Sequence, residues 1–411
     1  MTRLPLLAGA LLLTACGAEP RAVTADDPDV ARIALENNAF TLDMHQQLSA
    51  DGGNVFHSPF SMNAALSMTY AGAQGTTASE MAQVLHIEAD APHHEPLGAL
   101  IRDLDGARRR AYSLDVANRI WGQDSMAWNA DFLALNEDAY GAPTVMTDFA
   151  ADPEGAREEI NGWVKDTTHD KIPELLPPGI VNTDTVMVLA NAVYFKADWA
   201  EAFDKADTSA DPFHRADESV VDVDTMHGTL DITLGTGEGF VAAGLPYGED
   251  AEVRMWVVLP NEDTDLVTVE SSLTAESLDI ALDDAVPMEA NVALPKLELR
   301  TKARLKDALT DLGMPTAFSD QADFGAMLEG SPQGPTGIKI DEVVHEAYVK
   351  IDEEGTEAAA ATAVVMGRLS ADPEPYAFTV DRPYLFLIRD ELTGTVLFIG
   401  RVADPSTASA E

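Results

Sequence analysis

The residue types that often do chemistry in proteins are present in this sequence, but not at the spacing of a catalytic or metal site. His93, His94 and Glu95 are adjacent and lie between two prolines. Adjacent side chains on a regular element point in different directions, so we expect no metal site there. His57 and Ser58 are also neighbours in sequence, which does not place a histidine as the general base of a serine nucleophile.

The common catalytic and nucleotide-binding motifs are absent from the sequence. It has no Gly-x-Ser-x-Gly elbow, no His-Glu-x-x-His helix and no glycine-rich loop that ends in Lys-Ser or Lys-Thr. The segment 72–76 has glycines but lacks that lysine. The acidic residues are too numerous for any pair to stand out as a glycosidase dyad. We therefore predict a protein that is not an enzyme, with no cofactor and no metal.

The chain is strongly acidic, with 70 Asp and Glu residues against 26 Lys and Arg residues and a formal net charge of −44. Such a surface repels polyanions, so we expect no nucleic-acid partner. The acidic residues are spread along the chain, as on a solvated surface. Adaptation to high salt and plain solubility both explain this pattern.

The N-terminus has the pattern of an export signal. Arg3 precedes an apolar run, residues 4–13, that is shorter than the ~20 residues of a membrane-spanning helix. Small residues then precede Cys16, the only cysteine of the chain. This end resembles the lipobox of bacterial lipoproteins, whose cysteine is acylated and becomes the new N-terminus. An ordinary cleavage site beside a chance cysteine is the alternative.

We expect four parts along the chain and export from the cytoplasm. The parts are a signal peptide, a flexible tether, one globular domain and a C-terminal tail, at residues 1–16, 17–29, 30–405 and 406–411. Gly17 stands where an Asp often retains lipoproteins at the inner membrane. We therefore expect the lipid anchor to hold the protein at the outer membrane of the cell envelope, with an extracellular protein as the alternative.

The hydrophobic pattern predicts helices mainly in the first third and strands in the rest, which is typical of one α+β domain. The helices are expected over residues 30–48, 61–70, 76–85, 152–169 and 303–312. The strands are expected over residues 186–195, 254–259, 293–299, 343–351, 378–388 and 396–400. Ser61 is expected to cap the second helix, and Thr77 with Glu80 to form a capping box in the third.

The most informative segment is residues 350–366. A predicted strand runs into an acidic turn with Gly355, and four alanines follow before Thr362. Taken alone, the alanine run favours a helix. The same small side chains also bury easily in a strand and lose little entropy on burial, and Gly355 provides a backbone pivot.

A resemblance to the serpin family favours the strand. Residues 353–362 are similar to the hinge of inhibitory serpins. Other segments resemble family motifs in the family's order, namely residues 54–61, 72–77, 161–164, 171–172, 191–199, 245–247, 294–296, 322–324 and 381–386. These matches span residues 30–405. Asp170 departs from the pattern, since serpins usually have glycine there, and it would be strained if that position needs a positive φ.

The resemblance implies an α+β serpin fold of about nine helices around three β-sheets, with an exposed reactive-centre loop. It also implies an inhibitor that traps serine endopeptidases as a suicide substrate. The protease cleaves the loop, and the freed hinge inserts into the central sheet as a new strand. The hinge would be Glu353, Glu354, Gly355, Thr356, Glu357, Ala358, Ala359, Ala360, Ala361 and Thr362. Non-inhibitory relatives tend to carry bulky, charged or proline residues there, and this chain has none between Ala358 and Ala363.

The family's spacing leaves two choices for the reactive bond. Leu369–Ser370 would suit a chymotrypsin-like, elastase-like or subtilisin-like protease, whereas Arg368–Leu369 would suit a trypsin-like one. We expect a monomer, with polymers possible if the loop of one molecule inserts into another. The alternatives are a non-inhibitory serpin that acts as a substrate or binding protein, and a cross-class inhibitor of cysteine proteases.

The resemblance also implies two groups of supporting residues. Ser58, Ser61, Asn191 and His345 match the polar cluster beneath the point where the sheet opens. Lys296 and Glu353, beside Trp199, match an ion pair at the top of the insertion site. We expect loss of that pair to loosen the sheet.

Overall fold

The computed structural model describes residues 23–104, 112–331, 334–335, 337–356 and 375–407. Nine α-helices lie within this part of the chain, at α1 Pro28–Leu48, α2 Pro59–Tyr70, α3 Gly75–Val84, α4 His94–Leu104, α5 Ala130–Tyr140, α6 Pro153–Thr167, α7 Leu266–Ser272, α8 Ala275–Asp283 and α9 Lys306–Leu312. None of the described helices is long and apolar enough to cross a bilayer.

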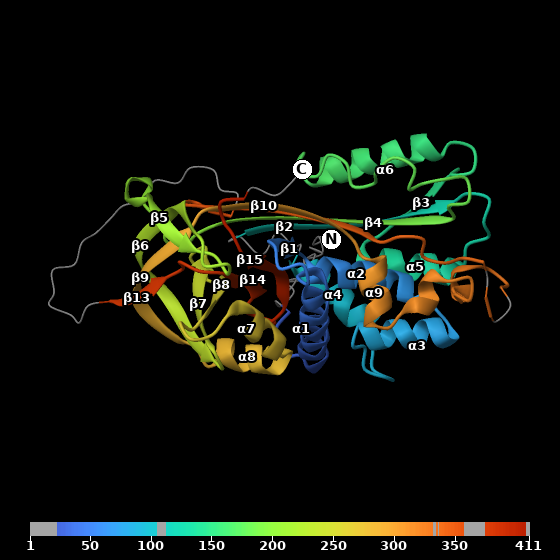
Figure 1. The fold of residues 1–411 in the computed structure, drawn as a ribbon. Helices are drawn as coiled ribbons and strands as arrows, with labels where there is room; N and C mark the ends of the chain where they lie inside the picture. Colours follow the sequence, from blue (N-terminus) through green and yellow to red (C-terminus); the bar gives the residue numbers. More distant parts are fainter. Residues whose placement is uncertain (1–22, 105–111, 332–333, 336, 357–374, 408–411) are drawn as a thin grey trace, which may run out of the picture.

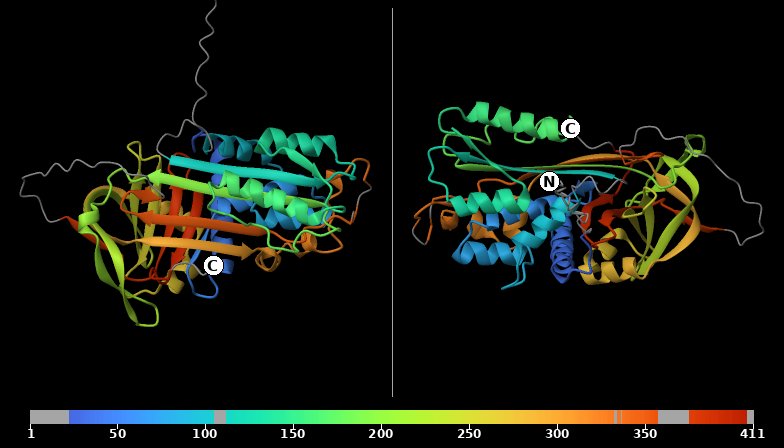
Figure 2. Two further views of the ribbon diagram at one scale, coloured as in Figure 1. Left: turned by 90° about the horizontal axis from the view of Figure 1, so that it is seen from above. Right: turned by 180° about the vertical axis from the view of Figure 1, so that it is seen from behind.

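The central sheet has six strands in the order β10-β11-β12-β4-β2-β3. Their bounds are β2 Tyr112–Gln123, β3 Thr144–Thr147, β4 Met187–Asp198, β10 Leu297–Arg304, β11 Val344–Asp352 and β12 Gly355–Thr356. The two-residue strand β12 is antiparallel to both of its neighbours, β11 and β4. The long neighbours β4 and β11 therefore run in the same direction (Figure 2), and in the described part of the chain β12 joins them in the sheet.

The remaining strands form a nine-stranded sheet along the path β1-β15-β14-β8-β7-β6-β9-β13, with β5 paired to β6. Their bounds are β1 Val55–His57, β5 Ser209–His214, β6 Val220–Gly237, β7 Phe240–Tyr247, β8 Val253–Pro260, β9 Val286–Pro295, β13 Tyr376–Thr379, β14 Tyr384–Asp390 and β15 Val396–Val402. The 18-residue strand β6 pairs with β5 near its start and with β7 near its end. Strand β6 therefore connects two groups of strands, one that includes β5 and one that includes β7. Counted with the central sheet, these two groups correspond to the three sheets expected from the sequence.

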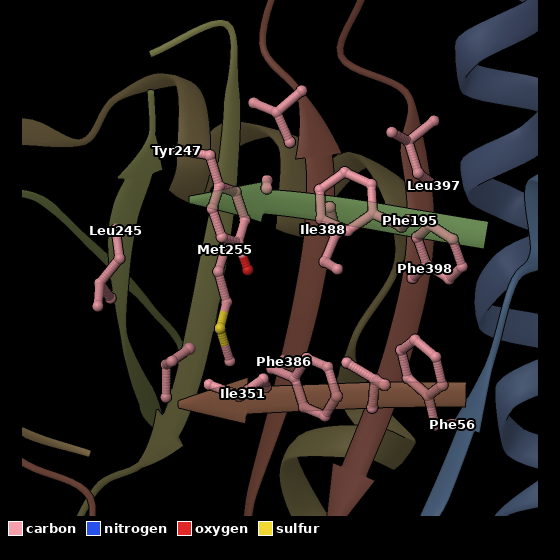
Figure 3. Packing of buried hydrophobic residues seen from close by; sticks show 14 of the residues in the cluster. Phe56, Phe195, Leu245, Tyr247, Met255, Ile351, Phe386, Ile388, Leu397 and Phe398 are labelled. Carbon is pink, nitrogen blue, oxygen red and sulfur yellow. The ribbon is translucent and has the colours of Figure 1, made fainter. Parts of the chain in front are cut away.

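The central sheet lies between two layers of helices (Figure 1). Helix α6 covers one face, where Arg119 of β2 stacks on Trp163 of the helix at 4.7 Å. The other face packs on α2 and on the nine-stranded sheet. Aromatic residues fill this inner layer, with the rings of Phe195 and Phe398 5.7 Å apart and those of Phe56 and Phe398 5.4 Å apart (Figure 3).

Two predicted strands are each divided in the structure. The strand expected over residues 293–299 is the end of β9 and the start of β10, which lie in different sheets. The break falls at Lys296, whose backbone N–H donates to the carbonyl oxygen of Asp224. The strand expected over residues 378–388 is likewise divided between β13 and β14. Pro383 lies in the break and cannot donate to a ladder.

Several helix ends also differ from the prediction. Helix α1 begins at Pro28, inside the predicted tether, because Asp27 caps it and proline is favoured in the first turn. Ser58, not Ser61, caps α2, since its side chain accepts from the Ser61 N–H. Helix α3 has no side-chain cap. Glu80 instead accepts hydrogen bonds from Thr316, so the predicted capping box was wrong.

The two ends of the described chain are held by hydrogen bonds. The N–H of Val23 donates to Asp103, and the N–H of Ala25 donates to the carbonyl oxygen of Leu392. Residues 23–29 are therefore not a free tether. At the other end, the side chain of Asn54 donates to Thr407.

Candidate functional site

The first part of the predicted hinge is already a strand of the central sheet. Thr356 pairs with Ile351 of β11 on one side and with Ala197 of β4 on the other. Gly355 pairs with Asp352 and Asp198 in the same way. The hinge therefore begins in the space between β4 and β11, which we call the β4–β11 gap.

Gly355 cannot be replaced by a larger residue without strain. Its φ of 147° lies in a region that L side chains rarely adopt. A Cβ atom at this position would also overlap the backbone carbonyl oxygen of Ala197. Glycine thus allows the chain to turn from β11 into the top of the gap.

Two aromatic residues hold the turn before β12. The indole N–H of Trp199 donates to the carbonyl oxygen of Asp352 at 2.9 Å, and its backbone N–H donates to the carbonyl of Glu354 at 3.0 Å. The ring of Trp199 stacks on Tyr247 with the centroids 4.5 Å apart. The hydroxyls of Tyr247 and Thr356 are 2.6 Å apart. Burial raises the pKa of Tyr247, so its phenol is neutral at physiological pH.

Glu353 is a buried carboxylate with several donors around it. Lys296 Nζ lies 2.9 Å and 3.0 Å from its two oxygens, and the Thr208 hydroxyl donates to it at 2.8 Å. Burial alone would raise the pKa of Glu353, but the hydrogen bonds from Lys296, the backbone and Thr208 hold it below its ordinary value. The ion pair expected from the sequence is therefore present, beside Trp199.

A second, more exposed ion pair lies next to the first. Lys205 Nζ is 2.6 Å from Glu354 Oε1, and the lysine side chain is 65% exposed. Water weakens such a pair, so we expect it to contribute much less than the Lys296–Glu353 pair. Sequence reasoning missed Lys205, Thr208 and Tyr247 because their partners are more than 100 positions away in the chain.

The four residues expected to form a polar cluster do lie together under the central sheet. The backbone N–H of Ser58 donates to His345 Nε2 at 3.2 Å, and the Ser61 hydroxyl donates to Asn191. Asn191 in turn donates to Asn118 of β2 at 2.6 Å, a member that the sequence did not indicate. Burial lowers the pKa of His345 to about 4, so its ring is neutral and can accept the Ser58 hydrogen bond.

Below β12, the β4–β11 gap contains no described strand and is lined mostly by apolar side chains. In the part of the chain that the structure describes, no backbone pairing joins β4 directly to β11. A cavity of about 100 Å³ lies there, between Met187 and Leu189 of β4 and Val343 and Val344 at the start of β11. Helix α2 forms the base of the cavity through Ala65 and neighbouring residues. The gap therefore has a polar, occupied top and an apolar, open bottom.

The family model described as serpin (serine protease inhibitor) matches residues 35–405. The chain belongs to the serpin family. It is 35% identical over 385 residues to the human leukocyte elastase inhibitor, covering 91% of this chain and all of that protein. A serpin-like protein of Thermococcus kodakarensis is also 35% identical, over 371 residues, with 90% and 84% coverage.

Solved serpin structures confirm the predicted fold. Uncleaved ovalbumin superposes with a TM-score of 0.81 at 26% identity, covering 91% of this chain and all of the ovalbumin chain. Serpin48 of the insect Tenebrio molitor gives a TM-score of 0.78 at 29% identity, covering 92% and 99%. The described residues that carry the serpin-like sequence motifs thus have a serpin fold, and the family supports a protease as the general class of partner.

Several predicted site residues of this serpin lie outside the described residues. They are the reactive-bond candidates Arg368, Leu369 and Ser370, the hinge residues 357–362 and the lipidation candidate Cys16. Asp170, which replaces the usual family glycine, is described and has a φ of 64°. The turn after α6 therefore does place a non-glycine residue in the strained region.

One cluster in this serpin resembles a catalytic triad, although the sequence gave no sign of it. Ser67 Oγ lies 2.9 Å from His93 Nε2, and His93 Nδ1 lies 3.4 Å from Glu36 Oε2. All three side chains are buried, and Ser67 has no exposed surface. A serine without access to solvent cannot attack a substrate. These contacts instead tie α1 and α2 to His93, the residue before α4. No metal-binding group of three or more ligands occurs among the described residues.

Proposed function

We propose that this serpin inhibits serine endopeptidases as a suicide substrate, through insertion of its cleaved loop into the β4–β11 gap. The observation that carries the proposal is the position of β12. The hinge already starts in the gap with a defined register, and an apolar cavity continues below it.

The register of β12 predicts where each later hinge residue would lie after insertion. Thr356 lies between Ala197 and Ile351. If the strand continues antiparallel to both neighbours, Thr362 reaches the level of Asn191 and His345. The polar residue of the hinge would then meet the polar cluster, which supports the insertion of this segment in this register.

The same register matches side-chain size and charge on both faces. Because strand residues alternate between faces, the small Ala358 would face the core at the level of Phe195. Val364 and Met366 would reach Leu189 and Met187 in the apolar cavity. On the outer face, Glu357 would lie between two basic residues, Lys196 of β4 and Lys350 of β11.

The energy released by insertion is sufficient to deform a protease. Strand β4 has 12 residues, and a new strand of that length would form two hydrogen-bond ladders. At about 1 kcal/mol net for each bond, the gain is on the order of 10–20 kcal/mol. A protease domain is stable by about 5–15 kcal/mol. Trapping of the acyl-enzyme is therefore energetically feasible, and no catalytic turnover by the serpin itself is required.

For the target, we propose an elastase-like, chymotrypsin-like or subtilisin-like protease cleaving Leu369–Ser370. The similarity to leukocyte elastase inhibitors supports this class over a trypsin-like protease, which would cleave Arg368–Leu369. The test is incubation with a panel of both protease classes, followed by SDS gel electrophoresis and mass spectrometry of the released C-terminal peptide. A covalent, SDS-stable complex is expected, and the peptide mass identifies the bond. Complete cleavage without any complex would overturn the proposal and indicate a non-inhibitory serpin.

We also propose export with lipid attachment at Cys16, which would hold the inhibitor at the cell envelope, at the outer membrane where the cell has one. The pattern of residues 3–16 supports this location. Mass spectrometry of the protein expressed in a bacterial host should find an acylated Cys16 at the N-terminus. A Cys16→Ala variant should be released from membranes, whereas equal membrane retention of both forms would contradict the proposal.

A further inference from the structure

Three buried histidines, His45, His57 and His345, lie in a row from α1 through β1 to β11 of the central sheet. His57 of β1 has no exposed surface, and its ring stacks on that of His45 of α1 at 5.6 Å with an angle of 17° between the planes. The next residue in the chain, Ser58, donates its backbone N–H to His345 of β11. These rings therefore link α1, β1 and β11.

The two ring nitrogens of His57 have no hydrogen-bond partner among the described residues. A buried polar group without a partner destabilises a fold, so its presence calls for an explanation. A neutral imidazole can be buried in such a site at moderate cost, because its ring is uncharged and packs against apolar groups. An imidazolium has two donors and a full charge, so it requires acceptors that this site lacks.

The charged groups around His57 do not compensate for a proton on its ring. Glu270 of α7 is the nearby buried carboxylate, but His45 Nε2 occupies one of its oxygens at 3.0 Å and Arg401 of β15 occupies the other at 2.7 Å. On β11, Glu346 contacts Arg300 of β10. Lys302 of β10 contacts the same carboxylate, and Thr301 of β10 accepts a hydrogen bond from the N–H of Phe56.

We propose that His57 is an acid switch, whose protonation displaces its ring from the junction of α1, β1 and β11 and so loosens β11 at the β4–β11 gap. Displacement of His57 moves the adjoining Ser58 and breaks its hydrogen bond to His345, at the level where the gap changes from polar to apolar. The sheet can then open without cleavage of the loop. An inhibitor with this switch would inactivate itself in an acidic compartment.

Electrostatics support the geometry. Burial lowers the pKa of His57 well below its ordinary value, and charge on His45 or His345 lowers it further. The neutral ring is therefore the stable form of the folded protein near pH 7. As the pH falls below 6.5, the open form takes up a proton before the closed form does, so acid favours opening.

The test is hydrogen–deuterium exchange of residues 344–352 between pH 7 and pH 5, corrected for the intrinsic pH dependence of exchange. This range stays above the isoelectric point of about 4.2. Because one titrating group changes an equilibrium by about tenfold for each pH unit, protonation of His57 should increase opening of β11 roughly tenfold between pH 6 and pH 5, in addition to the effect of His345. This readout needs no protease, so its outcome is independent of whether the protein inhibits one.

Three variants identify the titrating group. His57→Phe keeps a flat ring that cannot take a proton, and it should lose the roughly tenfold part of the acid-induced increase that His57 contributes, while the part due to His345 remains. His57→Leu provides a smaller apolar side chain in case phenylalanine does not fit the site. His214→Phe is the matched control, since it removes an exposed histidine of β5, and it should behave like the parent protein. Equal acid-induced opening in the His57 variants and the parent, or none in the parent, would overturn the proposal.

Discussion

The upper and lower parts of the β4–β11 gap differ in how they are filled. The upper part holds β12, the buried Lys296–Glu353 ion pair and the Tyr247–Thr356 hydrogen bond. The lower part has no strand in it and encloses an apolar cavity. The top therefore fixes the register of the hinge, and the bottom leaves room for the strand that would follow.

This difference separates the two tasks of an inserting loop. Polar contacts with fixed geometry determine where insertion starts, whereas an unpaired apolar gap provides the free energy that completes it. Changes at the top should therefore alter the stability of the closed sheet and the start of insertion. Changes at the bottom should alter mainly how much is gained when the strand goes in.

The largest effect is expected at the buried ion pair. Glu353→Lys places two positive charges together in a buried site, and the free energy of unfolding should fall by about 3–5 kcal/mol. The loosened top should also allow loops to insert between molecules, so polymers should form on prolonged warming. Urea unfolding and size-exclusion chromatography measure the two effects.

The matched control is charge reversal at the neighbouring pair. Glu354→Lys breaks the contact with the mostly exposed Lys205, and it should lower the free energy of unfolding far less than Glu353→Lys does. If Glu353→Lys stays monomeric and as stable as this control, the ion pair does not hold the top of the gap closed.

The next largest effect is a pH dependence of stability caused by His345, which lies where the upper and lower parts of the gap meet. His345 has a pKa of about 4 in the folded protein against 6.5 ordinarily. The unfolded chain therefore takes up this proton first, and the stability that the neutral ring provides is lost as the pH falls from 6.5 toward 4. The loss should be about 1.4 kcal/mol for each pH unit, or roughly 3 kcal/mol in all.

Urea unfolding between pH 7.5 and pH 5 tests this pH dependence. His345→Gln keeps an acceptor for Ser58 but cannot titrate, so its stability should depend less steeply on pH than that of the parent. His214→Gln, at an exposed position, should not change the slope. An unchanged slope in His345→Gln would show that this histidine does not titrate between these limits.

A smaller loss of stability is expected from a substitution in the turn that leads from β11 into the gap. Gly355→Ala adds a Cβ that overlaps Ala197 and requires an unfavourable φ, and it should cost about 1–3 kcal/mol. Gly53→Ala is the control, because no atom lies within 4 Å of the added Cβ. Thermal unfolding compares the two, and equal stability would mean that β12 can be displaced without cost.

The smallest effect is expected in the lower part. Ala65 of α2 is 5% exposed and lines the cavity, so Ala65→Leu should fill part of that space and raise stability by about 1 kcal/mol. The same side chain should slow insertion of a cleaved loop, which native gel electrophoresis can follow over time. Ala308→Leu, on α9 outside the cavity lining, is the control. Destabilisation by Ala65→Leu would mean that the cavity has no usable volume.

The fold could be predicted from the sequence largely because serpin motifs occur in order along most of the chain. Local pattern alone was less reliable. It joined β9 to β10 across Lys296, since a run of alternating apolar residues does not reveal a change of sheet. It also paired Glu80 with Thr77, whereas the carboxylate binds Thr316, 236 positions away.

The candidate site was predicted in part for the same reason. Glu353, Lys296 and three members of the polar cluster, Ser58, Ser61 and Asn191, lie in motifs that resemble the family. Tyr247, Asn118 and the buried ring of His57 acquire their roles through contacts with other helices and strands, and local spacing along the chain does not encode such contacts. Equally, nothing in the sequence around His93 indicates that Ser67 and Glu36 lie beside it in the folded chain.

The central claim, that the β4–β11 gap receives the cleaved loop as a strand, is tested most directly by thermal unfolding of the intact and the loop-cleaved protein. A non-target protease that cuts between residues 364 and 370 provides the cleaved form. If the loop inserts, the new ladders should raise stability by on the order of 10 kcal/mol, and the cleaved protein should unfold at a much higher temperature. An equal or lower unfolding temperature after complete cleavage would contradict the claim.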